Sequence, residues 1–410
     1  MKRLPRWLPG AALAAVLAGC AANPMTGRSQ ISLLPESQVV AQATQAYSAE
    51  LKPWRQKGRV NSDLAMMERV NAITNRLIYQ AIRFRPDTAK WDWQVAVIDD
   101  AKTLNAFCLP GGRMAIYSGL IVKLEATDDE IAQVMGHEIA HALANHGVER
   151  MSQGMLGDIL VSAVGGSRGR QQGAQLATLL FWQLPNSRDN ESEADRIGIE
   201  VAARAGYDPA AAPSLWRKMA AANGGSAGLS FLSTHPAPKT RMADLERLVP
   251  DMRPLYLEAR SGPLYSYGRL ASNVRDVSPG AAPPPTSLKP LTLISPTYER
   301  FKRGEAVLDC TDCALGFGGR SDALRDLHAR GQWEALAREV LDLNYSQDIA
   351  WYYLGEAARG LGQPAAARRY YEQAMALSGQ RETHCKGTFR DLCGGIRLPE
   401  AARSALGALP

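Results

Sequence analysis

The sequence predicts a mainly α protein of the α+β class, in which a helical domain with a small antiparallel sheet is followed by a second helical domain. Two observations predict it. Apolar side chains recur at helical spacing over long stretches in both halves of the chain, and two short extended segments interrupt the first of these halves. We expect a leader at residues 1–20, a first domain at 21–250, a Pro-rich linker at 251–305 and a second domain at 306–410.

The composition is that of a folded chain. Its 410 residues are 46% apolar, which is enough for two or three domains with their own cores. The 47 basic and 41 acidic residues give a formal charge of +6, without any run of five or more like charges. Such a run would mark a nucleic-acid-binding tail, so we expect no nucleic-acid partner.

The first twenty residues differ from the rest of the chain. They begin with Lys2 and Arg3, continue with a mostly apolar stretch at 8–18, and end in Leu-Ala-Gly-Cys at Cys20. This pattern is typical of a signal peptide, and its end resembles the lipobox of bacterial lipoproteins, in which the cysteine is lipidated. Ordinary secretion is the alternative. Since Ala21 resembles the outer-membrane sorting class, we expect a lipid anchor in the outer membrane and a protein that faces the periplasm.

The first helical pattern covers residues near 36–82. Val70, Ile73, Leu77 and Ile78 form one apolar stripe, and we expect this helix to pack over the first domain.

Two extended segments follow this helix. Apolar and polar residues alternate over 91–98, and residues 105–115 are extended on both sides of a Pro-Gly-Gly break at 110–112. These segments predict two strands of a small antiparallel sheet.

Thr127 begins the next helix, because it is a good N-cap and is followed by three acids that suit the positive end of a helix. The third acid, Glu130, occupies the capping-box position, and we expect the helix over 131–146. Residues 151–175 are Gly-rich and weakly apolar. They predict a mobile lid, with a membrane-facing loop as the alternative.

Helical patterns return further along the chain. We expect helices at 187–204 and 210–222, and a linker at 273–296. Residues 350–378 resemble a tetratricopeptide repeat, and a partial copy lies near 331–335. Fewer than three repeats are visible, so a plain helical hairpin is the alternative.

Export would place the remaining cysteines in an oxidising compartment. Cys310, Cys313, Cys385 and Cys393 are even in number, which predicts two disulfides, and a zinc ribbon built on the first pair is the alternative. Cys108 lies in an apolar, strand-like stretch, and we expect it to be a buried free thiol.

His137, Glu138 and His141 form the pattern His-Glu-x-x-His in the helix that Thr127 begins. Histidines four residues apart project from one helix face, so both imidazoles can bind one metal ion. Glu138 lies about 100° around the helix from His137, where it can take a proton from a water on the metal. The pattern also occurs by chance, so a third ligand is needed.

A second acidic helix supplies candidates for that ligand. Catalytic zinc has three protein ligands and one open position. Glu191 and Asp195 share a helix face, so Glu191 can bind the metal while Asp195 accepts the ring N–H of a ligand histidine. Glu193, about 200° around the helix from Glu191, is the alternative ligand. An ordinary charged helix face would account for the same residues without a metal.

Together these residues resemble peptidase family M48. The pattern His-Glu-x-x-His is followed about fifty residues later by Glu-x-x-x-Asp. Other matching segments are residues 23–28, 105–107, 109–112 and 233–236, and Arg241. The resemblance covers about residues 23–248. It is strongest for the BepA/LoiP-like periplasmic branch, which is related to the Oma-type and CAAX prenyl endopeptidases.

The resemblance implies a zincin-like helical metalloprotease fold and a zinc metalloendopeptidase of the gluzincin type. It assigns one Zn²⁺ per chain to His137, His141 and Glu191, and the role of general base to Glu138. It also implies protein quality control in the periplasm, with unfolded or misassembled envelope proteins as substrates.

Two further segments are candidates for the site. A strand at Asn105, Ala106 and Phe107 can bind extended substrate as an added strand, unless the fold covers it. His235 has two roles open to it: it donates to the oxyanion, or it occupies the open metal position and keeps the enzyme latent. A structural histidine is the alternative.

A rival function is an envelope assembly chaperone or partner-binding lipoprotein, in which proteolysis is secondary and the second helical domain binds a protein partner. Glu138 separates the two functions, because a structural metal site needs no base beside an open coordination position.

Overall fold

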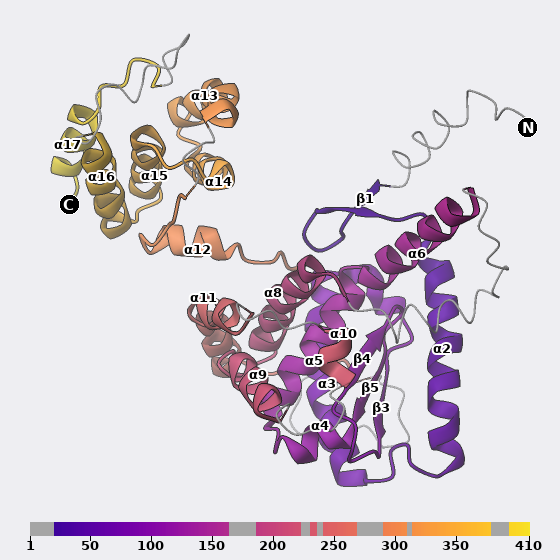
Figure 1. The fold of residues 1–410 in the computed structure, drawn as a ribbon. Coiled ribbons are helices and arrows are strands. Elements are labelled where there is room, and N and C mark those ends of the chain that lie inside the picture. Colours follow the sequence, from indigo (N-terminus) through magenta and orange to yellow (C-terminus); the bar gives the residue numbers. More distant parts are fainter. Residues whose placement is uncertain are drawn as a thin grey trace, which may run out of the picture. The chain divides into compact units, whose positions relative to one another are not determined.

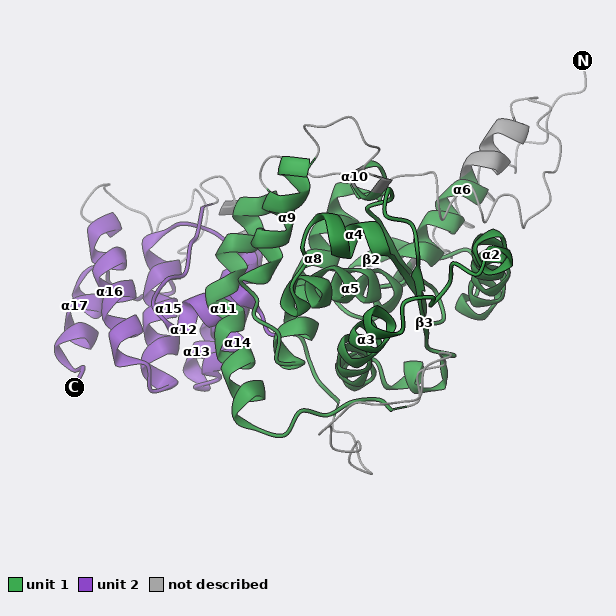
Figure 2. Cartoon of the chain, turned by 90° about the horizontal axis from the view of Figure 1, so that it is seen from below, with its two compact units in different colours: residues 1–293 green, residues 294–410 purple. Residues whose placement is uncertain are grey.

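A computed structural model of the chain describes residues 20–163, 186–222, 230–235, 241–268, 290–309, 314–378 and 393–410 (Figure 1). Most of the expected leader, most of the expected linker at 273–296 and residues 164–175 of the expected lid lie outside these ranges. The chain divides into two compact units, Met1–Leu293 and Ile294–Pro410 (Figure 2). The predicted class is confirmed, because the described elements are mostly helices with small sheets.

Two helices form where one helical stretch was expected at 36–82. Helix α2 covers Glu36–Gln56 and α3 covers Leu64–Phe84. The chain between them contains Gly58 and Asn61 at φ of 67° and 54°, a left-handed conformation that ends a helix. Asp63 then caps α3 by accepting a hydrogen bond from the backbone N–H of Met66 at 3.0 Å.

The main sheet has three strands, β3 (Gln94–Ile98), β4 (Ala106–Leu109) and β5 (Arg113–Tyr117), in the order β3-β5-β4. Strands β4 and β5 are antiparallel, but β3 and β5 are parallel. The small sheet was predicted as antiparallel with two strands from these segments, but it is mixed, and the second segment forms two of its three strands. The break in the second segment is a hairpin turn, in which Gly111 and Gly112 have φ of 89° and 83°.

Side chains alternate between the two faces of this sheet. Val95 and Val97 pack with α3 in the larger core, whereas Ala96 and Ile98 pack with α2 in the smaller one. The apolar stripe predicted on α3 is buried, so this helix is part of the core rather than a cover over it.

Helix α5 (Asp128–Leu143) begins with the predicted capping box, in which the Thr127 hydroxyl accepts from the Glu130 N–H and the Glu130 carboxylate accepts from the Thr127 N–H. It ends earlier than predicted, before Asn145 at φ of 57°. Helix α6 (His146–Ala163) follows, so residues 151–163 are helical and not part of a lid loop. The short α4 covers Ser118–Lys123, and the 3₁₀ helix η1 covers Pro86–Lys90.

The rest of the first unit is helical. Helix α8 covers Arg188–Arg204 with Ser187 as its N-cap, and α9 covers Ala211–Ala222, both close to the predicted ranges. Helices α10 (Ser230–Thr234) and α11 (Arg241–Ser261) follow, and α11 extends past the expected boundary at 250. A small ribbon of β1 (Cys20–Ala22) and β2 (Ser29–Ile31) forms the start of the described chain.

The second unit consists of helices with a core of their own. They are α12 (Pro296–Lys302), α13 (Ala314–Ala329), α14 (Trp333–Leu343), α15 (Asp348–Gly360), α16 (Pro364–Ser378) and α17 (Glu400–Gly407). Cys393 is disulfide-bonded, as the even number of C-terminal cysteines predicted, while Cys310, Cys313 and Cys385 lie outside the described residues. Within the described part of the chain, no helix is long and apolar enough to span a bilayer.

Candidate metal centre

Helix α5 presents two imidazoles on its inner face. His137 and His141 are each 5% exposed, and their Nε2 atoms lie 3.0 Å apart. The capping box holds the start of this helix, and every side chain from Ile131 to Leu143 is buried, so the helix is fixed along its whole length. The i, i+4 spacing therefore has the geometric result that the sequence predicted.

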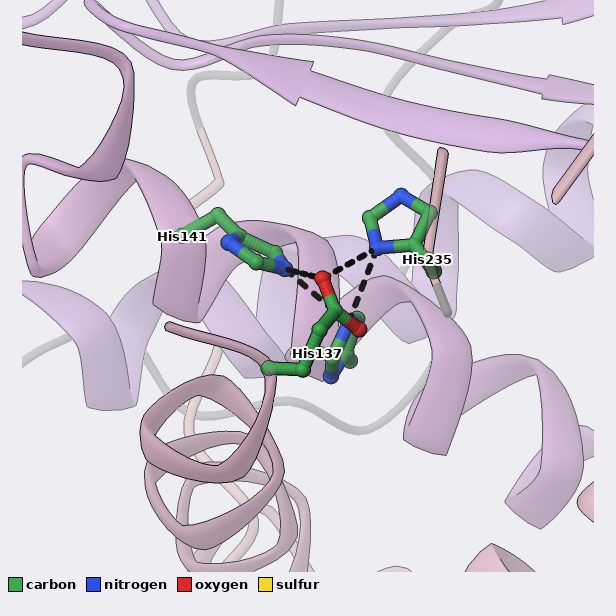
Figure 3. Close-up of side chains that lie close together, drawn as sticks. His137, His141 and His235 are labelled. Atoms are coloured by element: carbon green, nitrogen blue, oxygen red, sulfur yellow. Dashed lines mark hydrogen bonds and ion pairs between the residues drawn. The ribbon is translucent and has the colours of Figure 1, made fainter. Parts of the chain in front are cut away.

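Glu191 on α8 places its carboxylate between these imidazoles. Its Oε1 is 3.3 Å from His141 Nε2, and its Oε2 is 3.4 Å from His137 Nε2. His235, directly after α10, points its Nδ1 at the same carboxylate at 2.9 Å (Figure 3). One ligand atom from each of these four residues lies within 4.8 Å of the others.

Two glycines explain why helices α5 and α8 come so close. A Cβ on Gly136 would lie 2.9 Å from the Gly198 carbonyl oxygen, and a Cβ on Gly198 would lie 2.7 Å from the backbone nitrogen of His137. The two backbones are therefore in direct contact beside the first ligand. This contact brings Glu191, two turns earlier on α8, within reach of both histidines.

We expect Gly198→Ala to destabilise the protein by about 1–3 kcal/mol, because the new methyl group pushes against rigid helix backbone. Thermal or urea unfolding of the metal-free protein measures this. Gly319→Ala is the matched control, since Gly319 is also helical but has nothing within 4 Å of its Cβ position. There alanine should stabilise, by up to about 1 kcal/mol. Equal effects of the two substitutions would contradict the close packing of α5 and α8.

The donor set fits a zinc ion. Burial by itself raises the pKa of Glu191, but His235, His137 and His141 more than offset this and hold it well below its usual value. Burial lowers the pKa of His141 well below its usual range, so this ring is neutral. Two imidazoles and a carboxylate are a ligand set of catalytic zinc, whose fourth position holds water or substrate. His235 adds a fourth donor atom to the cluster.

His137 differs from His141 in its surroundings. Burial lowers its pKa, but hydrogen bonds and charge from Asp195 and Glu191 outweigh burial and raise the pKa to about 9. A metal ion that binds this ring therefore displaces a proton. Asp195 Oδ1 lies 3.0 Å from His137 Nδ1, which is the position predicted for an acceptor that orients a ligand histidine.

Arg241 has a place in the site that spacing alone did not suggest. It donates to Asp195 Oδ2 and to Glu191 Oε2, both at 2.6 Å, and lies 3.8 Å above the Trp216 ring. The arginine is 5% exposed, so it balances the negative charge of two buried carboxylates. In the sequence, Arg241 stood out only as one of the residues that carry the family resemblance.

Glu138 lies beside the cluster and not in it. Its Oε1 is buried, accepts no hydrogen bond from the described residues, and is 3.4 Å from His235 Nε2. Burial raises the pKa of Glu138. A carboxylate with a free oxygen and a raised pKa next to a metal site is suited to accept and return a proton.

A small cavity of about 50 Å³ opens beside Glu138, His141 and His235. Its other wall is the strand predicted to bind substrate, with Asn105, Ala106 and Phe107 among the lining residues. In the described sheet, β4 pairs only with β5, so it is an edge strand. Cys108, on the same strand, is buried and free as predicted.

The alternative ligand Glu193 is not in the cluster. Its Oε2 is 3.0 Å from His146 Nε2, and Arg28 Nε donates to the same oxygen at 3.1 Å. Glu193 lies on another side of α8 from Glu191, as the 200° separation requires. Sequence reasoning overlooked His146, whose ring contacts His141 from the side away from the metal position.

Comparisons with known proteins agree with this geometry. Residues 65–249 match the profile of Peptidase family M48. The mitochondrial metalloendopeptidase OMA1 of Saccharomyces cerevisiae is 33% identical over 181 residues, which cover 43% of this chain and 52% of that protein. OMA1 of Arabidopsis thaliana is 36% identical over 42% of this chain and 35% of its own length. The Beta-barrel assembly-enhancing protease of Escherichia coli is 29% identical over 52% of this chain and 47% of its own. The chain thus spans about half or less of the length of these relatives.

Proposed function

The chain contains a domain of peptidase family M48 at residues 65–249, and we propose that the whole protein is a zinc metalloendopeptidase. The observation that carries the proposal is the buried convergence of His137, His141 and Glu191, beside which Glu138 Oε1 accepts no hydrogen bond from the described residues. A structural metal site has no use for such a carboxylate. Casein cleavage that survives Glu138→Gln would contradict the proposal.

The chemistry follows from the position of each residue. His137, His141 and Glu191 would hold a zinc ion, which would supply Lewis-acid activation of a water molecule and of the scissile carbonyl. Glu138 would accept the proton of the attacking water and return it to the leaving amine, and its raised pKa suits both transfers. Asp195 and Arg241 keep His137 and Glu191 in place.

We propose extended, unfolded polypeptide as the substrate class. Strand β4 lies along the cavity next to Glu138 and has one edge without a partner strand in the described sheet. A peptide added there would bind through its backbone, which demands an extended conformation but little sequence. Unfolded or misassembled envelope proteins have this property, so the proposal includes quality control in the bacterial envelope.

His235 bears on regulation of the site. Its Nδ1 is 2.9 Å from Glu191 Oε1 and 3.3 Å from His137 Nε2, which is the position of a fourth ligand rather than of a donor aimed past the cluster. We therefore favour the latent-state role over the oxyanion role. Stacking on Phe231, with ring centroids 4.4 Å apart, holds the imidazole there.

We expect His235→Ala to raise the basal rate of casein cleavage, because it removes the imidazole that competes with water for the fourth position on the zinc ion. The initial rate at saturating casein and fixed zinc measures this. A histidine that stabilises the oxyanion predicts the opposite, a fall of about 10²–10³-fold in kcat. His328→Ala is a suitable control, since His328 lies in the second unit and pairs with Glu356.

The proposed location rests on the leader pattern in residues 1–20 of the sequence. We propose that Cys20 is lipidated and that the protein is anchored in the outer membrane, facing the periplasm. We expect Cys20→Ser to shift the protein from the membrane fraction to the soluble fraction, because it removes the only acyl attachment site of the leader pattern. Immunoblots of separated membrane and soluble fractions measure this. Cys108→Ser is the control, and unchanged membrane association of Cys20→Ser would overturn the anchor.

The helices of the second unit are proposed to form a tetratricopeptide-like surface that binds a protein partner. Packed helix pairs such as α15 and α16 are the building units of such repeats. An assembly chaperone with secondary proteolysis remains the alternative function. It predicts that Glu138→Gln retains the biological role, whereas a protease loses it.

A further inference from the structure

We propose that Arg28, Glu193 and His146 form a chain of contacts from the N-terminal segment to the metal site, and that this chain positions His141 for metal binding. The inference rests on the proposed function, since it concerns the same site. The three residues would be positioning residues, because none of them reaches the position of the metal or of the substrate.

The first link joins two histidines. His141 directs Nε2 towards Glu191 and His137, and its other ring nitrogen, Nδ1, lies 2.8 Å from Nδ1 of His146. His146 is fully buried, at 0% exposure. Ligand histidines in metal sites generally have the second ring nitrogen held by a partner that sets the ring's orientation and tautomer. In this site an imidazole is that partner.

The second link determines which nitrogen carries each proton. Glu193 Oε2 lies 3.0 Å from His146 Nε2, and a carboxylate can only accept, so His146 donates from Nε2. A neutral His146 then accepts at Nδ1, which requires His141 to donate from its own Nδ1. His141 is left with a lone pair on Nε2, the atom that faces the cluster. The opposite order would place a proton on the metal-binding nitrogen.

The third link comes from the N-terminus. Arg28 donates from Nε to Glu193 at 3.1 Å and from both terminal nitrogens to Glu149, at 3.2 and 2.9 Å. The Thr26 hydroxyl also donates to Glu193. Both glutamates are nearly buried, with side chains 7% and 9% exposed, so Arg28 compensates two charges that water hardly reaches.

The segment that carries Arg28 is itself anchored on the active-site helices. Asn23 donates from Nδ2 to the carbonyl of Ala144, directly after α5, at 3.1 Å. The backbone N–H of Leu33 donates to the Ser152 hydroxyl on α6 at 2.9 Å. The N-terminal segment thus contacts α5, α6 and α8 around His146. Arg28 itself lies only eight residues after Cys20.

Zinc affinity of the full-length protein tests the inference, measured by competition with a chromophoric chelator. We expect His146→Phe, which keeps an aromatic ring but cannot accept, to weaken zinc binding by roughly 10–100-fold. His146→Gln can accept from His141 and donate to Glu193, so it should recover most of that loss. Arg28→Ala should weaken zinc binding by about 10-fold, and Arg28→Lys by less.

Arg69→Ala is the matched control. Arg69 is 35% exposed compared with 33% for Arg28, and it pairs with Asp128, the first residue of α5, far along the helix from the ligands. A purely structural role predicts similar changes in the melting temperature of the metal-free Arg28→Ala and Arg69→Ala proteins, with zinc affinity intact in both. Zinc affinity equal to wild type in Arg28→Ala and His146→Phe would overturn the inference.

The inference and the proposed function fail in different ways. If the Arg28 and His146 variants bind zinc normally while Glu138→Gln abolishes cleavage, the inference is wrong and the proposed peptidase function stands. If these variants lose zinc affinity but the wild-type protein cleaves no casein, the chain of contacts stands and the proposed peptidase function is wrong.

Discussion

Glu138→Gln is expected to reduce casein cleavage by about 10²–10⁴-fold while the protein stays folded and binds zinc normally. Glutamine has nearly the volume of glutamate but cannot accept a proton at neutral pH. Glu138 contributes no ligand atom to the cluster, so zinc affinity has no reason to change. Because Glu138 Oε1 accepts no hydrogen bond from the described residues, the substitution also breaks no such bond there.

The initial rate of casein cleavage measures the loss of activity, and competition with a chelator on the same preparation measures the zinc affinity. Glu130→Gln is the matched control, since Glu130 is also a buried acid on α5 but caps the helix and pairs with Lys218. It should lower stability and keep cleavage. Full activity in Glu138→Gln would remove the general base from the proposal, and loss of zinc would mean that Glu138 is a ligand.

Glu191→Gln is expected to remove most of the stability that the wild type gains from binding zinc. An amide oxygen is a much weaker zinc ligand than a carboxylate, so we expect the affinity to fall by on the order of 100-fold or more. At free zinc of 1,000 times the wild-type Kd, the wild type gains about 4.1 kcal/mol of stability from binding. A variant with 100-fold weaker binding gains only about 1.4 kcal/mol by the same relation.

Unfolding with and without zinc measures this difference. Glu200→Gln serves as the control, because Glu200 is also fully buried on α8 but pairs with Arg196 and Arg204 and takes no part in the cluster. Its gain on zinc binding should equal that of the wild type. If Glu191→Gln gained as much as the wild type, the third ligand would lie elsewhere.

Some features of the site were predictable because they depend on residues close together in the chain. His137 and His141 share a face on any helix, and the capping box of Thr127 and Glu130 makes a helix form there. The same periodicity separates Glu191 from Glu193 on α8. The approach of Gly136 to Gly198 was not predictable, since a glycine pattern does not say which backbone comes near.

His146 shows the limit of periodic reasoning most clearly. On a continuous helix it would lie about 140° around from His141 and would not touch it. The left-handed Asn145 ends α5, and α6 begins at His146. As a result, the Nδ1 atoms of His141 and His146 lie 2.8 Å apart. The same kind of interruption, at Gly58 and Asn61, divides the stretch at 36–82 into two helices. In both cases, one or two residues with a left-handed φ end a helix that the apolar spacing alone would continue.

From the residues alone came the candidate metal ligands, the candidate base, and the two helices that carry them, because ligand type and helical spacing are local properties. Only the three-dimensional packing decided that the sheet is mixed, that Arg241 neutralises Glu191 and Asp195, and that Arg28 reaches Glu193. Each of these contacts joins positions tens to more than a hundred residues apart, and such pairs are selected by the burial of shared surfaces rather than by any pattern along the chain.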